Sequence, residues 1–330
     1  MSDVLLRRIV LLVCALFAIP LSANGEEYFY NNGIFVGLGA QASIMKRDKD
    51  IAYGFKGFCD PTQICVPLIP ALKPTDISDT AVSPTLTVGY KVNDDNFVSL
   101  YGDWSHFSVN GSRTVGPAFT TIAVDGIGSE HIGGTTMNVS LDWKSNVYNV
   151  GLEYQRRLLG SKIMTWLGSL GVRNRNEIQK FHVRAVSPDV TGPFDNYHEE
   201  LTEHLVGPYG GLRLSVKPSE TSKFTFRFKG DLGWYFKWAS LDAHNRYFNG
   251  FRFSNSDDAN NGTLFAVAGL NVIYAFTKNW FIDLGYEFSW IDAVAHISNA
   301  NVSKQGLPSK IVDTTLFNHA PALKLVYKFD

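Results

Sequence analysis

The 330-residue sequence predicts an all-β protein, an up-and-down antiparallel transmembrane β-barrel of about ten strands, with eight or twelve as alternatives. Two observations carry this prediction. Apolar and polar residues alternate over many segments, and the connections between these segments are short and long in turn. The composition agrees, because 29 glycines and 13% aromatic residues favour β-structure with many tight turns.

The composition also excludes several classes of protein. With 45% hydrophobic residues the chain is not disordered, and a net charge of -1 lacks the basic excess of a nucleic-acid-binding protein. No stretch contains the roughly 18 to 20 consecutive apolar residues that a membrane-spanning helix requires. We therefore expect no nucleic-acid partner and no helical membrane protein.

Ten segments of alternating residues are candidates for strands. The connections after the second, fourth, sixth and eighth are short, such as VNDDN at 92–96 and FTKN at 276–279, and the others are long. One rim of tight turns and one rim of long loops is the pattern of an up-and-down barrel. The expected strands are 33–46, 82–92, 97–113, 135–158, 162–185, 199–217, 223–240, 262–275, 280–295 and 314–329, and the expected long loops are 47–81, 114–134, 186–198, 241–261 and 296–313.

Residues 223–238, KFTFRFKGDLGWYFKW, show the alternation most clearly. The even positions from Phe224 to Trp238 are Phe, Leu or Trp apart from Gly230, whereas charged residues such as Asp231 take odd positions. A lipocalin-like barrel or a sandwich, the soluble alternatives, would bury the apolar side in a filled interior. A membrane barrel reverses the two faces, so we expect aromatic rings against lipid and charges in the lumen.

The N-terminus has the pattern of a targeting segment. Arg7 and Arg8 precede an apolar run that is too short to span a membrane, and small residues follow it, so residues 1–25 are expected to be a cleaved signal peptide. Residues 26–330 are then expected to form a single barrel domain. The mature chain keeps Cys59 and Cys65, whose short spacing in an exported chain predicts a disulfide.

Charges of both signs lie on the polar faces of the expected strands. Side chains fill a barrel of about ten strands, whereas wide aqueous channels belong to about sixteen or more. We therefore expect these charges to pair across the lumen and plug it, the alternative being a narrow pore in which they select ions or small solutes. The candidate lumen charges are Asp103, Glu153, Arg173, Arg175, Glu177, Arg213, Arg227, Lys229, Asp231, Asp283, Glu287 and Lys324.

Motifs for catalysis or metal binding are weak. The histidines in YHEELTEH, residues 197–204, lack the H-E-x-x-H spacing of zinc proteases, and on a strand His198 and His204 share one face while Glu199 and Glu203 take the other. We expect no metal, no cofactor and no catalytic residue. An outer-membrane enzyme remains an alternative, since four polar residues fall near the expected outer rim: Asp125, His131, Asp258 and His296.

Parts of the sequence resemble known barrel families. The run DWKSNVYNVGLEYQRRLLGSKIMTWLGSLGVRNRNEIQKF and the later HLVGPYGGLRL, NWFIDLGYEFSWIDAVA and LFNHAPALKLVYKF resemble the families typified by the Legionella major outer membrane protein and by a planctomycete outer-membrane β-barrel family. The resemblance implies a fold and a location, and it brings no catalytic motif. One departure is that Phe329, the aromatic residue expected at the end of such barrels, is followed by Asp330.

These observations together predict an integral outer-membrane β-barrel with a structural or surface-interaction role and a charged, largely plugged lumen. The alternatives are a narrow porin-like channel and an outer-membrane enzyme. The expected partners are outer-membrane lipid and lipopolysaccharide, the barrel-assembly machinery, and a surface ligand held by the loops.

Overall fold

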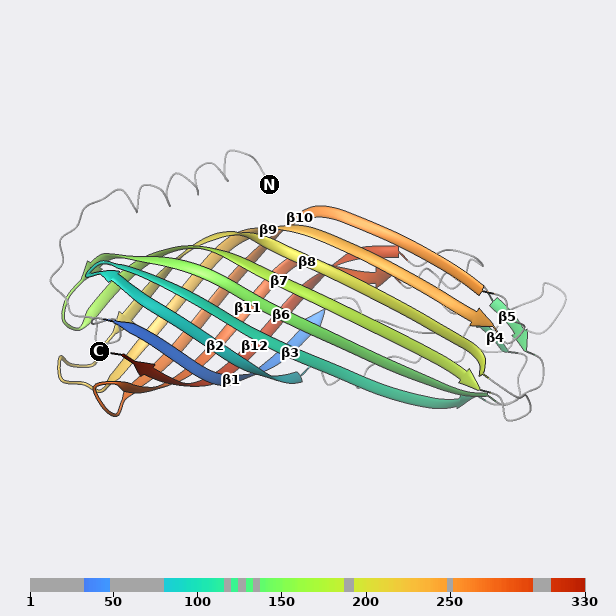
Figure 1. The fold of residues 1–330 in the computed structure, drawn as a ribbon, viewed down its shortest axis with the longest axis horizontal. Coiled ribbons are helices and arrows are strands. Elements are labelled where there is room, and N and C mark those ends of the chain that lie inside the picture. Colours follow the sequence, from blue (N-terminus) through green and yellow to red (C-terminus); the bar gives the residue numbers. More distant parts are fainter. Residues whose placement is uncertain are drawn as a thin grey trace.

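In the computed structural model, ten antiparallel strands close into a barrel, and two further short strands form a separate sheet (Figure 1). The structure describes residues 33–47, 80–115, 120–123, 129–132, 137–186, 193–247, 252–298 and 310–329. The barrel strands are β1 (Ile34–Arg47), β2 (Thr80–Asn93), β3 (Asn96–Val115), β6 (Met137–Gly160), β7 (Met164–Val186), β8 (Pro193–Val216), β9 (Phe224–Tyr247), β10 (Arg252–Ala275), β11 (Trp280–Ser298) and β12 (Lys310–Lys328). The separate sheet consists of β4 (Thr120–Ala123) and β5 (Ser129–Ile132).

Each barrel strand pairs with its neighbours along the chain, and β1 closes the ring by pairing with both β2 and β12. The predicted up-and-down topology and the ten-strand count are therefore confirmed. No helix in the described part of the chain is long and apolar enough to cross a membrane. The expected signal peptide at 1–25, Cys59, Cys65 and Asp125 lie outside the described residues.

The observed strand ends agree with the predicted ones at one rim of the barrel but not at the other. At the short-turn rim the strand ends lie within about two residues of the expected ones, as at Gly160 and Ala275. At the opposite rim the strands run into all five of the expected long loops, by one or two residues at Arg47, Thr80–Ala81 and Thr114–Val115 and much further in the other three. In the expected loops 186–198, 241–261 and 296–313, strand covers 186, 193–198, 241–247, 252–261, 296–298 and 310–313, and the expected loop 114–134 contains β4 and β5.

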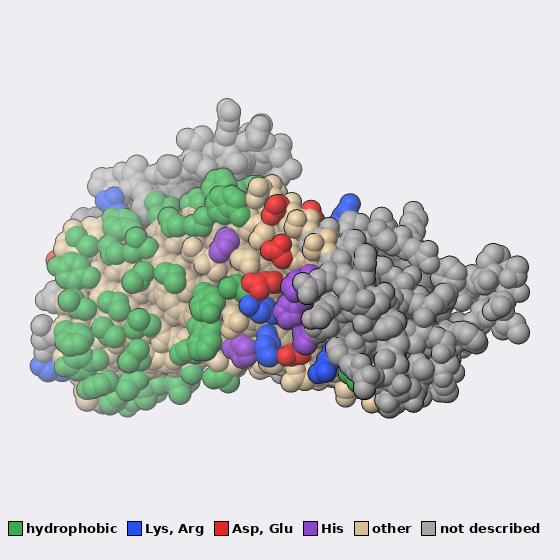
Figure 2. Space-filling view, turned by 45° about the vertical axis from the view of Figure 1, so that its right-hand side comes forward, with side chains coloured by type: hydrophobic (Ala, Val, Ile, Leu, Met, Phe, Trp, Pro, Cys, Tyr) green, Lys and Arg blue, Asp and Glu red, His purple; other side chains and the backbone are tan. Residues whose placement is uncertain are grey.

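A belt of large apolar side chains surrounds the outside of the barrel. On β9, Phe228, Trp234 and Phe236 point outward and are 46%, 39% and 54% exposed. Leaving such side chains in water would cost roughly 1.5–3 kcal/mol each, so the belt lies in hydrocarbon. Figure 2 shows this belt on one face of the molecule, next to a zone in which charged and histidine side chains gather. The chain is thus an integral β-barrel of the outer-membrane type, with closure satisfying its backbone groups in lipid.

The hydrophobic alternation changes phase where the strands leave this belt. On β9 the apolar residues are even-numbered and outward as far as Trp238, but beyond it Leu241 and Ala243 are buried while Asp242 and His244 are exposed. The change marks the level at which the outer face meets water instead of lipid. Above that level the sheet has its apolar face inside and its polar face outside, as in a soluble protein.

Six of the strands continue above the closed part of the barrel. Pairing of β2 with β3 ends at Thr85↔Asp103 and pairing of β10 with β11 ends at Phe265↔Ile291. In contrast, β3 pairs with β6 as far as Val115↔Met137, and β9 pairs with β10 as far as Arg246↔Arg252. Strands β3 and β6 to β10 therefore form a curved wall that extends past β1 and β2 (Figure 1). This wall is what the sequence-based loop boundaries missed.

The depth of the belt can be tested with a matched pair of charges on β9. Leu232 lies outward in the middle of the apolar run, and Ser240 lies outward above it. Leu232→Arg should destabilise the barrel by about 2–4 kcal/mol, whereas Ser240→Arg should change stability by less than about 0.5 kcal/mol. The measurement is a urea unfolding titration in liposomes. Equal destabilisation by the two variants would contradict this assignment of lipid depth.

Candidate functional site

The lumen of the barrel is the candidate functional site, and side chains fill it in three layers. The first layer is apolar and lies near the short-turn rim. Its rings and aliphatic groups come from strands on all sides, and Phe97, Leu167 and Phe281 are at most 2% exposed. The whole layer consists of Phe35, Phe97, Leu167, Ile273, Ala275, Phe281 and Val326. It fills this end of the lumen together with Lys91 and Arg157, which lie opposite Phe97 and Leu167 in the sheet.

The second layer is charged and is centred on Arg213 of β8. The Arg213 guanidinium donates to both carboxylate oxygens of Asp231, with Nη2 to Oδ2 at 3.1 Å, and it also donates to Glu153. The Tyr209 hydroxyl donates to the same Glu153 carboxylate at 2.7 Å. All three charged residues are buried. One arginine thus balances two acids contributed by two other strands, β6 and β9.

A second arginine in this layer, Arg173, lies among aromatic rings. Its guanidinium carbon is 5.4 Å from the centre of the Tyr101 ring, 5.5 Å from Tyr209 and 5.7 Å from Phe265. Its Nε also donates to the Tyr101 hydroxyl at 2.8 Å. Rings of this kind attract a cation through their negative faces. The arrangement holds a charge in the lumen with little help from acids, the nearest ion pair being with Glu287 at 4.0 Å.

Other charged residues of the second layer also have hydrogen-bonding partners. Lys229 donates to Glu287. Asn149 donates to Asp103 at 2.9 Å, and Asn271 donates to Asp283 at 2.7 Å. Buried charges are costly unless they are paired and hydrogen-bonded, so these contacts are what allow the layer to exist.

A cavity of about 220 Å³ lies within the charged layer. Its lining includes Tyr101, Asp103, Arg227 and Lys324, and it reaches Phe35 of the first layer and Met45 of the third. A polar space of this size has room for several water molecules. The interior thus contains a chamber large enough for water between two apolar layers.

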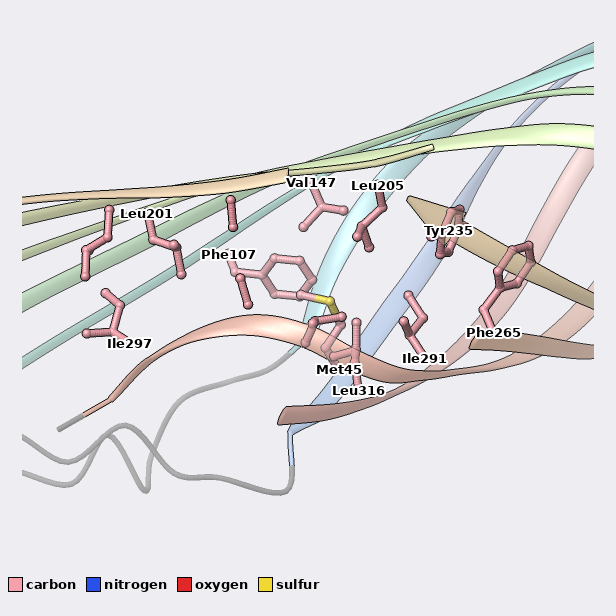
Figure 3. Close-up of a cluster of buried hydrophobic side chains, with 14 of the residues drawn as sticks. Met45, Phe107, Val147, Leu201, Leu205, Tyr235, Phe265, Ile291, Ile297 and Leu316 are labelled. Carbon is pink, nitrogen blue, oxygen red and sulfur yellow. The ribbon is translucent and has the colours of Figure 1, made fainter. Parts of the chain in front are cut away.

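The third layer is the large apolar cluster towards the long-loop rim. Figure 3 shows side chains such as Phe107, Leu201 and Ile297 pointing into the space between the wall and β11. Trp143 and Phe181, which also belong to this cluster, are 2% and 0% exposed. Its residues lie on the inward face above the phase change. They form a core like that of a soluble protein, and it covers the outer end of the chamber.

A buried ionic cluster lies beside the third layer. Arg175 donates to Glu177 at 2.7 Å and to Glu203 at 3.3 Å. Arg47, at the end of β1, donates to Glu177 as well, and so does the Ser145 hydroxyl at 2.8 Å. These contacts join β1 to β6, β7 and β8 across the lumen. The inward charges predicted from sequence are therefore present, and they share the lumen with apolar layers.

The outer ends of β11 and β12, residues 291–298 and 310–316, fold over the lumen, and together they are called the hairpin end. The register of β11 against β12 shifts between Ile291 and Val294, beyond the point where β11 leaves β10. The Ala293 amide then donates to Thr263 Oγ1 at 2.8 Å, and the Ile311 amide donates to Asp257 Oδ2 at 2.7 Å. The hairpin end thereby contacts side chains on the inner face of β10.

Lys237 and Glu203 hold the same hairpin end. Lys237, which is 1% exposed, donates to Asp313 and to the Ala293 carbonyl at 3.3 Å. The Ala295 amide donates to Glu203. Buried polar groups of β8 and β9 thus anchor β11 and β12, and these anchors fix the hairpin end as a lid on the chamber.

The structure places the sequence-predicted lumen charges on the inward face. All of them line the chamber or lie buried beside it, Glu177 and Asp231 being the two that do not line it. What sequence reasoning missed are the inward aromatic residues Phe97, Phe107, Trp143, Phe181, Phe265 and Phe281. A signal was available, because the segment from Phe97 to Val109 carries apolar residues at odd as well as even positions.

Of the candidate enzymatic residues, Asp125 lies outside the described part of the chain, and Asp258 and His296 are not brought together. Asp258 points outward and is exposed on β10, whereas His296 is buried on β11. His131 belongs to the separate β4–β5 sheet. His198 and His204 do face outward on β8 while Glu199 and Glu203 are buried. Among the described residues, no group of three or more His, Cys, Asp or Glu is placed to hold a metal ion.

No family model matches the chain. It is similar in structure to the outer membrane protease OmpT of Escherichia coli, with 11% sequence identity, a TM-score of 0.50, and 94% of this chain and 99% of that chain covered. A major outer membrane protein of Thermus thermophilus gives 9% identity, a TM-score of 0.31, and coverages of 89% and 99%. A 164-residue stretch is 29% identical to cubilin of Sus scrofa and covers 45% of this chain but 4% of that protein. The similarity to OmpT shows the fold alone.

The charged layer can be tested through Arg213. Arg213→Met leaves the buried Glu153 and Asp231 without their shared cation and should cost about 3–5 kcal/mol of stability. The triple variant Arg213→Met, Glu153→Gln, Asp231→Asn removes the stranded charges and should cost less than the single substitution. Unfolding in urea, followed by tryptophan fluorescence in detergent micelles, measures both.

A surface ion pair supplies the control for this experiment. Lys162 and Glu220 are 3.2 Å apart, and their side chains are 69% and 59% exposed. Lys162→Met should cost no more than about 1 kcal/mol. A triple variant less stable than Arg213→Met alone would show that Arg213 does not serve mainly to neutralise the two acids.

Proposed function

We propose that this protein is an integral outer-membrane barrel with a structural or surface-interaction role and a lumen closed to solutes. The observation that carries this proposal is the succession of layers along the lumen. An apolar layer, a charged layer and a second apolar layer lie in series, and the lid formed by β11 and β12 covers the last of them. Any diffusing ion would have to cross both apolar layers.

Electrostatics supports closure of the lumen. A hydrophobic constriction blocks conduction by excluding water, and two such constrictions in series block it more strongly. Several of the charges between them are paired with one another, as with Arg213 and its two acids. A selective pore instead needs charges that are available to a passing ion.

The wall above the belt supports a role at the cell surface. Its outward face carries polar residues from β3 to β10, including Asn110, Lys180 and Asp242, and it extends the barrel past the lipid. We propose that the belt contacts outer-membrane lipid and that the lower part of the wall contacts lipopolysaccharide. A ligand held by the loops and assembly by the barrel-assembly machinery belong to the same proposal, as does membership of the families that parts of the sequence resemble.

A narrow channel for ions or small solutes is the second candidate. The observation in its favour is the chamber of about 220 Å³, whose lining is partly polar. The lid is held by a small set of hydrogen bonds to Thr263, Asp257, Lys237 and Glu203. If the lid moved, the third layer would open on one side. We propose no enzymatic role, because Asp258 points outward whereas His296 is buried.

Planar-bilayer recording distinguishes a closed barrel from a channel. The unmodified protein should give no discrete conductance steps. Phe97→Ala with Phe281→Ala opens the first layer, and Phe107→Ala with Phe181→Ala opens the third. Each pair alone should stay silent because the other layer still blocks the lumen, and all four substitutions together should produce conductance.

Protection of the barrel from protease in liposomes confirms that each variant has inserted. Steps in the unmodified protein that change size when Arg227 or Asp231 is neutralised would overturn the proposal in favour of the channel. Conductance from either pair alone would show that one layer is already permeable.

A further inference from the structure

Three histidines from neighbouring strands form a row on the outer face of the wall. His182 of β7 is directly opposite His198 of β8, and His198 is directly opposite His244 of β9. All three side chains point outward above the apolar belt. The ring centres of His182 and His198 are 5.2 Å apart, and those of His198 and His244 are also 5.2 Å apart.

This spacing is the one that two imidazoles adopt on a single metal ion. A zinc–nitrogen bond is about 2.0–2.1 Å long and the ligands are arranged tetrahedrally, so the centres of two coordinating rings lie roughly 5 Å apart. Two rings packed in van der Waals contact also lie at similar distances. A metal site further requires that its ligands be held firmly in position. Both rings stand on adjacent rigid strands, which position ligands better than loops do.

One ion cannot take all three histidines. Adjacent strands are about 4.8 Å apart, so His182 and His244 are separated by roughly twice that distance. This agrees with the finding that no group of three ligands in the described residues surrounds one point. Each possible site is therefore a pair, and His198 belongs to both pairs.

We propose that His198, together with His244 or His182, binds a divalent transition-metal ion at the outer face of the wall. Imidazole suits zinc, nickel and copper, whereas magnesium and calcium prefer oxygen ligands. Because the row faces solvent, water can complete the coordination. A bound ion would tie two strands of the wall together above the lipid.

Burial and the neighbouring cationic groups favour the neutral form of His198. Burial, together with the neighbouring His182, His244 and Lys180, lowers the pKa of His198, and Glu200 opposes them. A neutral imidazole is the form that binds a metal. Asp142 of β6 lies opposite His182 and pairs with Lys144, and Asp242 of β9 lies opposite Glu200, which pairs with Lys180.

The test uses the full-length protein without an affinity tag, folded in detergent and freed of metal by chelator. Isothermal titration with zinc chloride should show binding that His198→Ala weakens by more than about ten-fold, since even an outer-shell partner of a metal ligand is worth roughly 10–100-fold. His182→Ala or His244→Ala alone should weaken binding less, because the other pair remains. The two together should match His198→Ala.

Three histidines elsewhere on the outer face have hydrogen-bonding partners, and two of them serve as matched controls. His106 is bonded to Asn146, His204 to Asn176 and His319 to Tyr286. His106→Ala and His204→Ala should leave zinc binding unchanged, and magnesium chloride should not bind. With copper, electron paramagnetic resonance should report two nitrogen ligands. Zinc binding that survives His198→Ala, or that falls equally in the two controls, would overturn the proposal.

Discussion

In a bilayer every backbone donor and acceptor must be satisfied within the protein, and the closed ladder of ten strands is how this chain meets that constraint. Closure fixes which side of each strand faces lipid. Because side chains alternate along a strand, half of the residues at membrane depth must then be apolar and point outward, as Phe228 and Leu284 do. The other half are left to fill a narrow lumen. The composition of the interior is therefore a consequence of closure.

A lumen of this width could be filled by charges alone, and the sequence led us to expect that. The structure uses charge in the central network and in a second ionic cluster beside the outer apolar layer. Arg213 with Glu153 and Asp231 occupies the middle, where each member meets its partners, whereas Phe97 and Phe281 close one end and Phe107 and Phe181 the other. Apolar rings are cheaper to place inside than unpaired ions, since they have no hydrogen bonds to lose. Layering thus lets apolar side chains occupy both ends of the lumen while the buried charges are grouped where they can pair.

The fold could be predicted from sequence because period-two alternation and turn length are local properties of the chain. The same local reading failed at the outer rim for a physical reason. Beyond Trp238 the apolar residues of β9 move from even to odd positions, and Leu241 and Ala243 pack inward while Asp242 faces water. Such a stretch is still strand, but its pattern no longer matches the lipid-facing template, so it was assigned to a loop. The lumen contacts could not be predicted, because pairs such as Arg47 with Glu177 join residues far apart in the chain.

Cross-strand register also explains why the histidine row was not visible in the sequence. Along β8 the nearest histidine to His198 is His204, yet these two are separated by six positions and His204 bonds to Asn176. The residues that come beside His198 are 16 and 46 positions away, and only the registers of β7 with β8 and of β8 with β9 align them. That alignment depends on the wall continuing as regular sheet above the lipid, where outward positions are free to be polar. The stretch misjudged as loop is therefore the part of the barrel in which side chains from several strands can combine into a site on the outer face.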